Sequence, residues 1–333
     1  MGQHYYKSGN LQEAYKTFHQ MRDYCQLPKH AAEMHLKLIL TAVAQENWVA
    51  VQRDLNRLRS LTLKPEDNAK IQPFIMPILG LSHMCSGTYK DAAKAFLQSD
   101  PTYGTLDAVA NVKPNTEILT TNDIATYGGL CALASLNRSE LERNVLANEN
   151  FRFFLELESH LRRAIVAFTH SRYTQCLEIL ESYRNDYLLD IYLQPHVDAL
   201  FSAIRRKSII AYTAPFSQVS ISSMAEAFNV NVERMEAELL EIIRSKDLDA
   251  RLDVVDMLLV ANRKDERHTL QEKALDVARE HEKNLRLRLY RINMLQAGLE
   301  VKGQKKSQND AFDQQGQGMG QGLGMRSGIG RGR

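Results

Sequence analysis

The fold is decided by residues 208–263, and above all by the run SISSMAEAFNVNVERMEAELLEIIRSKDLDARLDVVDMLLVA at residues 220–261. Serines cap a short apolar helix at 224–228, and a turn at 229–231 separates it from a second helix at 232–244. Apolar side chains recur on one side of this second helix, which indicates that this side is buried. These side chains are Met235, Leu239, Ile242 and Ile243.

Two strands are predicted after these helices. Residues 248–253 alternate apolar and charged side chains, as a half-buried strand does, and residues 257–261 offer a second strand to pair with it. Helix, turn, helix and strand hairpin in this order predict a winged helix. One strand must present unpaired N–H and C=O groups to which a strand of another protein can add. The residues predicted for this protein interface are Leu248, Ala250, Leu252, Leu258 and Val260.

The charge of the second helix argues against DNA binding. In a DNA reader this helix would lie in the major groove and carry Arg, Lys, Asn or Gln. Here glutamates outnumber arginines, and carboxylates beside phosphates would weaken binding. The acidic residues are Glu233, Glu236, Glu238 and Glu241, and the basic residues are Arg234 and Arg244. The module is therefore predicted to bind protein.

Length, charge and cysteine spacing exclude several classes of protein. A chain of 333 residues can hold two domains, and its 42 basic and 40 acidic residues nearly cancel, so no global field recruits nucleic acid or membrane. No apolar run approaches the roughly 20 residues that span a bilayer, and the N-terminus lacks the pattern of a signal peptide. The widely spaced cysteines favour reduced, buried thiols in a cytoplasmic or nuclear protein, and they are Cys25, Cys85, Cys131 and Cys176.

Two stretches in the N-terminal part share a fingerprint typical of tetratricopeptide-like helical pairs. The second copy follows the first by 78 residues, and partial copies begin at Trp48 and Tyr173. The implied period of about 40 residues fits one antiparallel helix pair. The matching positions are Gly2, Tyr5, Gly9, Leu11, Ala14 and Phe18, and then Gly80, His83, Gly87, Tyr89, Ala92 and Phe96. The chain is therefore predicted to be mainly α, with a right-handed superhelix of helical hairpins before the winged helix.

The predicted organisation has four parts. Residues 1–204 form the helical-repeat solenoid, which is interrupted by turn-rich breaks at 64–68 and 111–115. Residues 205–265 form the winged helix, and residues 266–300 form one long charged helix. The Gly/Gln-rich segment 301–333 cannot bury enough apolar surface to fold, so we expect a disordered tail.

The long terminal helix carries an apolar seam whose residues fall mostly three, four or seven apart. A helix that stands beyond the last folded module typically packs against helices of other chains. The alternative is that it docks on its own domain. The seam residues predicted to form a protein interface are Val277, Leu285, Leu289, Ile292 and Leu295.

No motif for catalysis, cofactor binding or metal binding occurs in the sequence. The ten histidines form neither His-Glu-x-x-His nor His-x-His, and the cysteines form no Cys-x-x-Cys. Nucleophile-elbow, dinucleotide-binding and nucleotide-cradle motifs are also absent. We therefore predict no catalytic residues, no cofactor and no metal site.

Solenoid, winged helix and terminal helix in this order resemble the PCI architecture, which is shared by scaffold subunits of the proteasome lid, the COP-nine signalosome and a translation initiation factor. Within it, the run YGGLCALA at 127–134 is the most specific likeness to the subunit-one family of the signalosome. Further similar stretches are 141–145, 154–158, 188–197 and, more weakly, 22–25.

The resemblance implies a non-catalytic scaffold subunit that supports cullin deneddylation and so regulates cullin-RING ubiquitin ligases in the cytoplasm and nucleus. The implied partners are other PCI subunits, and the MPN subunits through a shared helical bundle, while cullin-RING ligases are contacted indirectly. The alternative is a lid subunit of the Rpn-seven type. A PCI adaptor that binds nucleic acid is a third reading, supported by basic residues at Arg286, Arg288, Arg291, Lys302, Lys305, Lys306, Arg326, Arg331 and Arg333.

Two features depart from the family pattern. Met1 opens inside the first repeat fingerprint, whereas the family carries further helices before it, so we expect the sequence to be a piece of a longer protein and Tyr5 and Tyr6 to face water. The Gly/Gln tail does not match the family tail.

Overall fold

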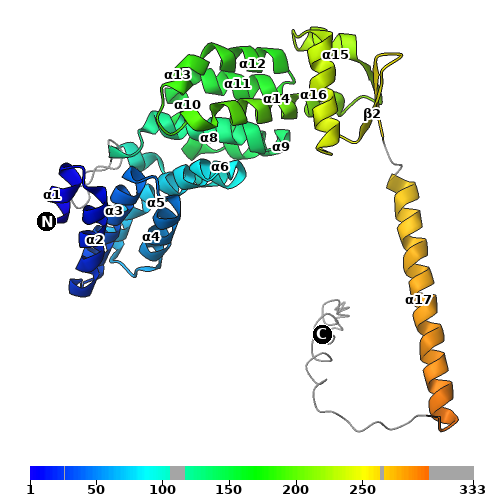
Figure 1. Cartoon of the computed structure of the whole chain (residues 1–333), viewed down its shortest axis with the longest axis horizontal. Helices are drawn as coiled ribbons and strands as arrows, with labels where there is room; N and C mark the ends of the chain where they lie inside the picture. The colour runs from blue at the N-terminus through cyan, green and yellow to red at the C-terminus, as the bar shows by residue number, and fades with distance from the viewer. Residues whose placement is uncertain (26, 106–116, 263–265, 300–333) are drawn as a thin grey trace, which may run out of the picture. The chain divides into compact units, whose positions relative to one another are not determined.

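The computed structural model of the chain is helical over most of its length and holds a small three-stranded sheet, so the prediction of a mainly α fold is confirmed (Figure 1). It divides into two compact units, residues 1–263 and 264–333. The residues that it describes are 1–25, 27–105, 117–262 and 266–299. The predicted break at 111–115 and the tail at 301–333 lie outside them.

The first unit begins with helices joined in pairs by short turns: α1 with α2, α3 with α4, and α5 with α6. Their bounds are α1 (Gly2–Lys7), α2 (Leu11–Gln20), α3 (Pro28–Ala44), α4 (Trp48–Ser60), α5 (Pro65–Cys85) and α6 (Tyr89–Leu97), with short 3-10 helices η1 (Met21–Tyr24) and η2 (Pro101–Thr105). The predicted break at 64–68 is shorter than expected, because α5 already begins at Pro65.

A second group of helices continues the stack toward the winged helix (Figure 1). Among them α11 and α12 form another close pair. Helix α8 contacts α6 before it in the chain and α10, α11 and α14 after it. Their bounds are α8 (Thr121–Ser135), α9 (Arg138–Leu141), η3 (Glu142–Leu146), α10 (Glu149–Leu157), α11 (Ser159–Thr169), α12 (Tyr173–Ser182), α13 (Arg184–Leu188), η4 (Gln194–His196) and α14 (Val197–Thr213).

The repeat fingerprint marks equivalent contacts within helix pairs. A Cβ atom at Gly2 would lie 2.6 Å from the ring of Phe18, and one at Gly80 would lie 2.8 Å from the ring of Phe96. Only glycine permits this approach, because such distances are too short for any side chain. The turns are equivalent too, since their glycines share a left-handed φ of 81° and 78°, and these are Gly9 and Gly87.

Of the three positions predicted to recur in each second helix, the last two are buried in all four copies, whereas the first is only half-buried in α2, α4 and α6. The last two positions are Ala14 and Phe18 in α2, Val51 and Leu55 in α4, Ala92 and Phe96 in α6, and Cys176 and Leu180 in α12. The right-handed superhelical path of the pairs stays a prediction.

The N-terminal tyrosines are less exposed than expected. Tyr5 and Tyr6 are both half-buried, and they pack against a small apolar cluster formed by Ala14, Phe18, Met34 and Leu38. The prediction that they face water was wrong, because α1 packs on α2 and brings both tyrosines against this cluster.

The winged helix comprises the end of α14, β1 (Gln218–Ser220), α15 (Ile221–Ala227), α16 (Val232–Arg244), β2 (Ala250–Asp253) and β3 (Leu258–Ala261). The second helix has the predicted bounds, and both predicted strands are present in shortened form. Strand β1 was not predicted, because three residues are too few to show an alternating pattern. The predicted boundary at 204/205 falls inside α14, which therefore belongs to both the helical stack and the winged helix.

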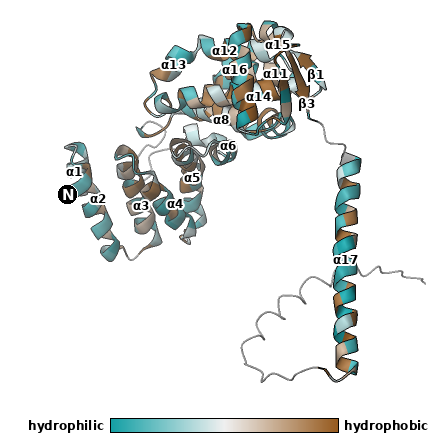
Figure 2. Cartoon of the chain, turned by 45° about the vertical axis from the view of Figure 1, so that its right-hand side comes forward, coloured by the Kyte–Doolittle hydropathy of each residue, from teal (hydrophilic) through white to brown (hydrophobic). Residues whose placement is uncertain are grey.

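The second unit contains one long described helix, α17 (Glu266–Gln296). It is mostly hydrophilic, with separate hydrophobic bands along its length (Figure 2). The predicted helix at 266–300 is present with nearly these bounds.

Neighbouring glycines in α8 provide a matched test of the packing. A Cβ at Gly128 would lie 2.8 Å from the Phe151 ring and 3.0 Å from Cβ of Phe96, whereas the nearest atom to a Cβ at Gly129 is 3.5 Å away. Gly128→Ala is expected to lower the free energy of unfolding by about 1–3 kcal/mol through overpacking. Gly129→Ala is expected to be neutral or to stabilise by up to about 1 kcal/mol, because alanine favours helix. Urea unfolding measures both, and equal effects would contradict the packing described.

Candidate protein-interaction site

The sheet of the winged helix has the order β1-β3-β2, so β3 is the central strand. Leu258 and Val260 therefore lie on a strand that is paired on both sides. Of the two predicted strands, only β2 has an edge without a partner strand among the described residues. The predicted interface residues Ala250 and Leu252 lie on β2, and Leu248 precedes it as a half-buried part of the core.

The register shows which backbone groups of β2 face outward. Asn262 donates its N–H to the carbonyl of Asp249 at 2.9 Å, and Arg251 lies opposite Val260. In an antiparallel ladder, hydrogen-bonded pairs alternate along the strand, so Arg251 bonds to β3. The N–H and C=O groups of Ala250 and Leu252 consequently point away from β3. These two residues can pair with an added strand.

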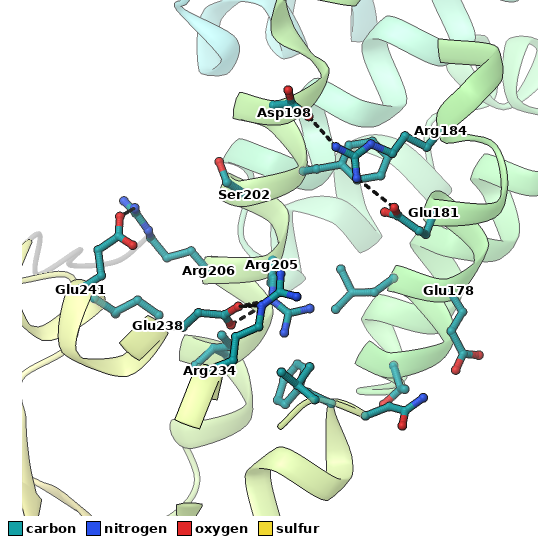
Figure 3. A pocket seen from close by; sticks show the side chains of 18 residues that line it. Glu178, Glu181, Arg184, Asp198, Ser202, Arg205, Arg206, Arg234, Glu238 and Glu241 are labelled. Carbon is teal, nitrogen blue, oxygen red and sulfur yellow. Dashed lines mark hydrogen bonds and ion pairs between the residues drawn. The ribbon is translucent and has the colours of Figure 1, made fainter. Parts of the chain in front are cut away.

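The acidic helix α16 turns two of its four glutamates toward α14. Arg205 donates from Nε to both carboxylate oxygens of Glu238, at 3.1 and 2.9 Å, and Arg206 lies 3.2 Å from Glu241 (Figure 3). Arg206 also reaches Asp247 at 3.4 Å. The acidity of α16 therefore serves first to dock the winged helix on the helical stack.

Contacts from α12 complete this junction. The hydroxyl of Thr174 donates to the carbonyl of Ala227, and the rings of Tyr173 and Phe228 stack with centroids 6.4 Å apart. Beside them lies a groove of about 650 Å³ between α12, α14 and α16 (Figure 3). Its floor is apolar, and its charged walls are largely paired internally, with Arg184 between Glu181 and Asp198. The groove thus lies at the junction between the helical stack and the winged helix.

The predicted interface of the terminal helix is uncovered among the described residues of its unit, 266–299. All five seam residues are exposed, from 45% for Leu285 to 67% for Val277. The others are Leu289, Ile292 and Leu295. That this stripe forms a protein interface stays a prediction.

Among the described residues no cluster of three or more His, Cys, Asp or Glu side chains could hold a metal ion, and no helix there is long and apolar enough to cross a membrane. Cys131 and Cys176 are buried, and burial raises the pKa of the Cys176 thiol to about 12. A thiol with so high a pKa is a poor nucleophile.

Comparisons with known proteins agree with this architecture. Residues 1–144 match the family described as 26S proteasome subunit RPN7, and residues 180–263 match the PCI domain. The winged helix and the helices that lead into it thus define a PCI-domain protein.

Proteins whose sequences match nearly the whole chain identify the family within this class. COP9 signalosome complex subunit 1 of Emericella nidulans is 43% identical over 95% of this chain, and that of Arabidopsis thaliana is 38% identical over 92%. The chain belongs to the COP9 signalosome complex subunit 1 family. It spans 64% and 67% of the length of these two relatives. The 26S proteasome regulatory subunit RPN7 of Saccharomyces cerevisiae is 26% identical over 57% of this chain and 43% of its own length.

Two arginines that share one glutamate test the junction. Arg205 and Arg234 both bond Glu238, but the Arg205 side chain is 25% exposed and that of Arg234 is 70% exposed. Arg205→Met is expected to lower the free energy of unfolding by about 1–3 kcal/mol, because it removes a charged, partly buried hydrogen-bonded pair. Arg234→Met is expected to change it by less than about 1 kcal/mol. Denaturant unfolding followed by circular dichroism compares the two, and a larger loss for Arg234→Met would refute this assignment.

Proposed function

We propose that this chain is a non-catalytic scaffold subunit of the COP9 signalosome, supporting cullin deneddylation and thereby the regulation of cullin-RING ubiquitin ligases. The observation that carries the proposal is the 38–43% identity to subunit 1 relatives over more than nine tenths of the chain. A scaffold acts through surfaces that hold other subunits in place. Two such surfaces are available, the edge of β2 and the seam of α17.

The β2 edge suits other PCI subunits. An added strand would bond the outward groups of Ala250 and Leu252, and the sheet would continue from one winged helix into the next. The α17 seam suits a shared helical bundle, through which the MPN subunits would be joined. Cullin-RING ligases would then be contacted indirectly, in the cytoplasm and the nucleus.

The lid alternative has weaker support. The RPN7 family covers only the helical part of the chain, and the yeast RPN7 relative is 26% identical. Nucleic-acid binding has less support. In α16, Glu238 and Glu241 pair with arginines of α14, and the two remaining glutamates, Glu233 and Glu236, are exposed and half-buried, respectively. These carboxylates would repel phosphates.

Reconstitution tests the proposal. The purified chain alone is expected to release no ubiquitin-like modifier from a conjugated cullin, with or without zinc. The complete set of signalosome subunits is expected to release it, and the same set without this chain is expected to be deficient in assembly and activity. Activity of the chain alone, or full activity and assembly without it, would overturn the proposal.

The same reconstitution tests α17. Leu289→Asp with Ile292→Asp places two charges in the seam, and burying them unpaired should remove the subunit from the complex on gel filtration. The control is Lys283→Asp, which changes the charge by the same amount on the opposite face of the helix. It is expected to leave assembly intact. If the double variant unfolds the isolated chain instead, α17 packs on its own domain.

A proline pair tests the β2 edge. Ala250→Pro removes an outward N–H and is expected to weaken co-purification with the other PCI subunits, while the melting temperature moves by only a few degrees, about 1 kcal/mol. Arg251→Pro instead removes a donor to β3, so it should lower the stability of the isolated chain. Unchanged co-purification of Ala250→Pro would exclude strand addition at β2.

A further inference from the structure

The groove between α12, α14 and α16 has an apolar floor that is only partly covered (Figure 3). Three of its apolar side chains are buried, and three are half-buried and keep part of their surface in water. Its volume of about 650 Å³ lies within the range of roughly 300–1,000 Å³ that is typical of ligand sites. Covering the exposed apolar surface would be favourable, so the floor suits an occupant with an apolar group. The buried side chains are Ile209, Phe228 and Ile242, and the half-buried ones are Leu177, Phe201 and Val230.

One wall of the groove holds two guanidinium groups around a single carboxylate. Glu238 accepts from Nε of Arg205 at 3.1 and 2.9 Å, and from Nε of Arg234 at 3.2 Å. Nη2 of Arg205 is buried and has no hydrogen-bond partner among the described residues. Buried donors are rarely left without an acceptor in native structures, because the loss of water is then uncompensated.

This arginine is open to the groove. Its side chain lines the groove and is 25% exposed, and that of Arg234 is 70% exposed. A carboxylate seated in the groove would therefore reach both guanidinium groups and would make the charge-assisted bonds for which arginine is suited. This wall favours an acidic group in the occupant.

The opposite wall has the reverse imbalance. Arg184 of α13 is shared by two carboxylates, Glu181 at 2.9 Å and Asp198 at 2.7 Å. Glu178 of α12 also lines the groove, is exposed, and has no ion pair among the residues that the structure describes. Figure 3 shows it on the side of the groove away from Glu238. This wall favours a basic group in the occupant.

The two walls together select a class of ligand. Over the whole lining, carboxylates outnumber guanidinium groups by five to four. A phosphate or a nucleic acid, which concentrates negative charge, would therefore gain little here. A ligand that separates an acidic and a basic group by an apolar one matches both walls and the floor. A peptide carries these three kinds of group along one backbone.

We propose that this groove binds a short peptide segment of another protein, in which an acidic and a basic side chain flank apolar ones. The acidic side chain bonds Arg205 and Arg234, the apolar ones cover the floor, and the basic one pairs with Glu178. Because such a peptide contacts the helical stack and the winged helix at once, its binding stabilises their junction. The inference goes beyond the proposed scaffold role and uses neither the β2 edge nor the α17 seam.

A display library of random short peptides, selected against the purified full chain, tests the proposal. Selection is expected to enrich peptides that carry Asp or Glu, then Leu, Ile or Phe, and then Lys or Arg. One enriched peptide is synthesised, and its Kd is measured by fluorescence anisotropy. Inorganic phosphate is expected to compete no better than sodium chloride of equal ionic strength. No enrichment, enrichment of peptides with charges of one sign only, or specific displacement by phosphate would overturn the proposal.

A matched pair of serine variants locates the bound peptide. Ser202 lines the groove, is exposed, and donates its hydroxyl to the carbonyl of Ala199 at 2.9 Å. Ser60, at the end of α4, is also exposed and makes the same kind of bond to Arg57 at 2.7 Å. Ser202→Trp fills the groove and is expected to weaken peptide binding at least about tenfold. Ser60→Trp is expected to have no effect, and both variants should keep the melting temperature of the unaltered chain.

A matched pair of arginine variants tests the charges. Arg234→Met is expected to weaken binding about tenfold, because it removes one of the two donors for the acidic side chain. Arg152→Met is the control, since Arg152 is likewise exposed and likewise pairs with the glutamate four residues on, Glu156 at 3.4 Å. Full binding by both Ser202→Trp and Arg234→Met would place the peptide elsewhere and refute the inference. These measurements use the isolated chain, so their failure would leave the proposed function standing.

Discussion

The helical stack depends on one steric constraint, the contact of a glycine in one helix with a phenylalanine of the next. Gly2 with Phe18 and Gly80 with Phe96 repeat it within pairs, and Gly128 repeats it against Phe151. Because close packing leaves no room for even a methyl group at these points, they set the spacing of α1 and α2, of α5 and α6, and of α8 and α10. Helix α14, which leads into the winged helix, packs in turn on α8.

The sequence predicted what short-range patterns encode. The glycine and phenylalanine positions, the bounds of α16 and the long terminal helix were all predicted, because each extends over enough residues to show its period. Strand β1 has three residues and was missed. The edge of the sheet was left open, since strand order depends on contacts between residues distant in sequence. The half-burial of Tyr5 and Tyr6 was missed for the same reason.

The charge of α16 shows how a correct pattern can have an unexpected use. Its glutamates argued against a DNA reader. Yet Glu238 and Glu241 contact arginines of α14, which a reading of the helix by itself does not show. A surface charge on a helix becomes an internal contact when the preceding helix carries the complement. The two adjacent arginines of α14, Arg205 and Arg206, were the feature of the sequence from which this pairing could have been predicted.

The shortness of β2 has a consequence for how a complex would be held together. With four residues, of which only Ala250 and Leu252 turn their backbone outward, the strand offers few hydrogen bonds to a neighbour. Such a contact is weak by itself and gains strength only when a second attachment raises the effective concentration of the two partners. A complex made this way binds tightly through all its contacts together, while each single contact can open and close. Its subunits would therefore exchange readily until the last attachment is made.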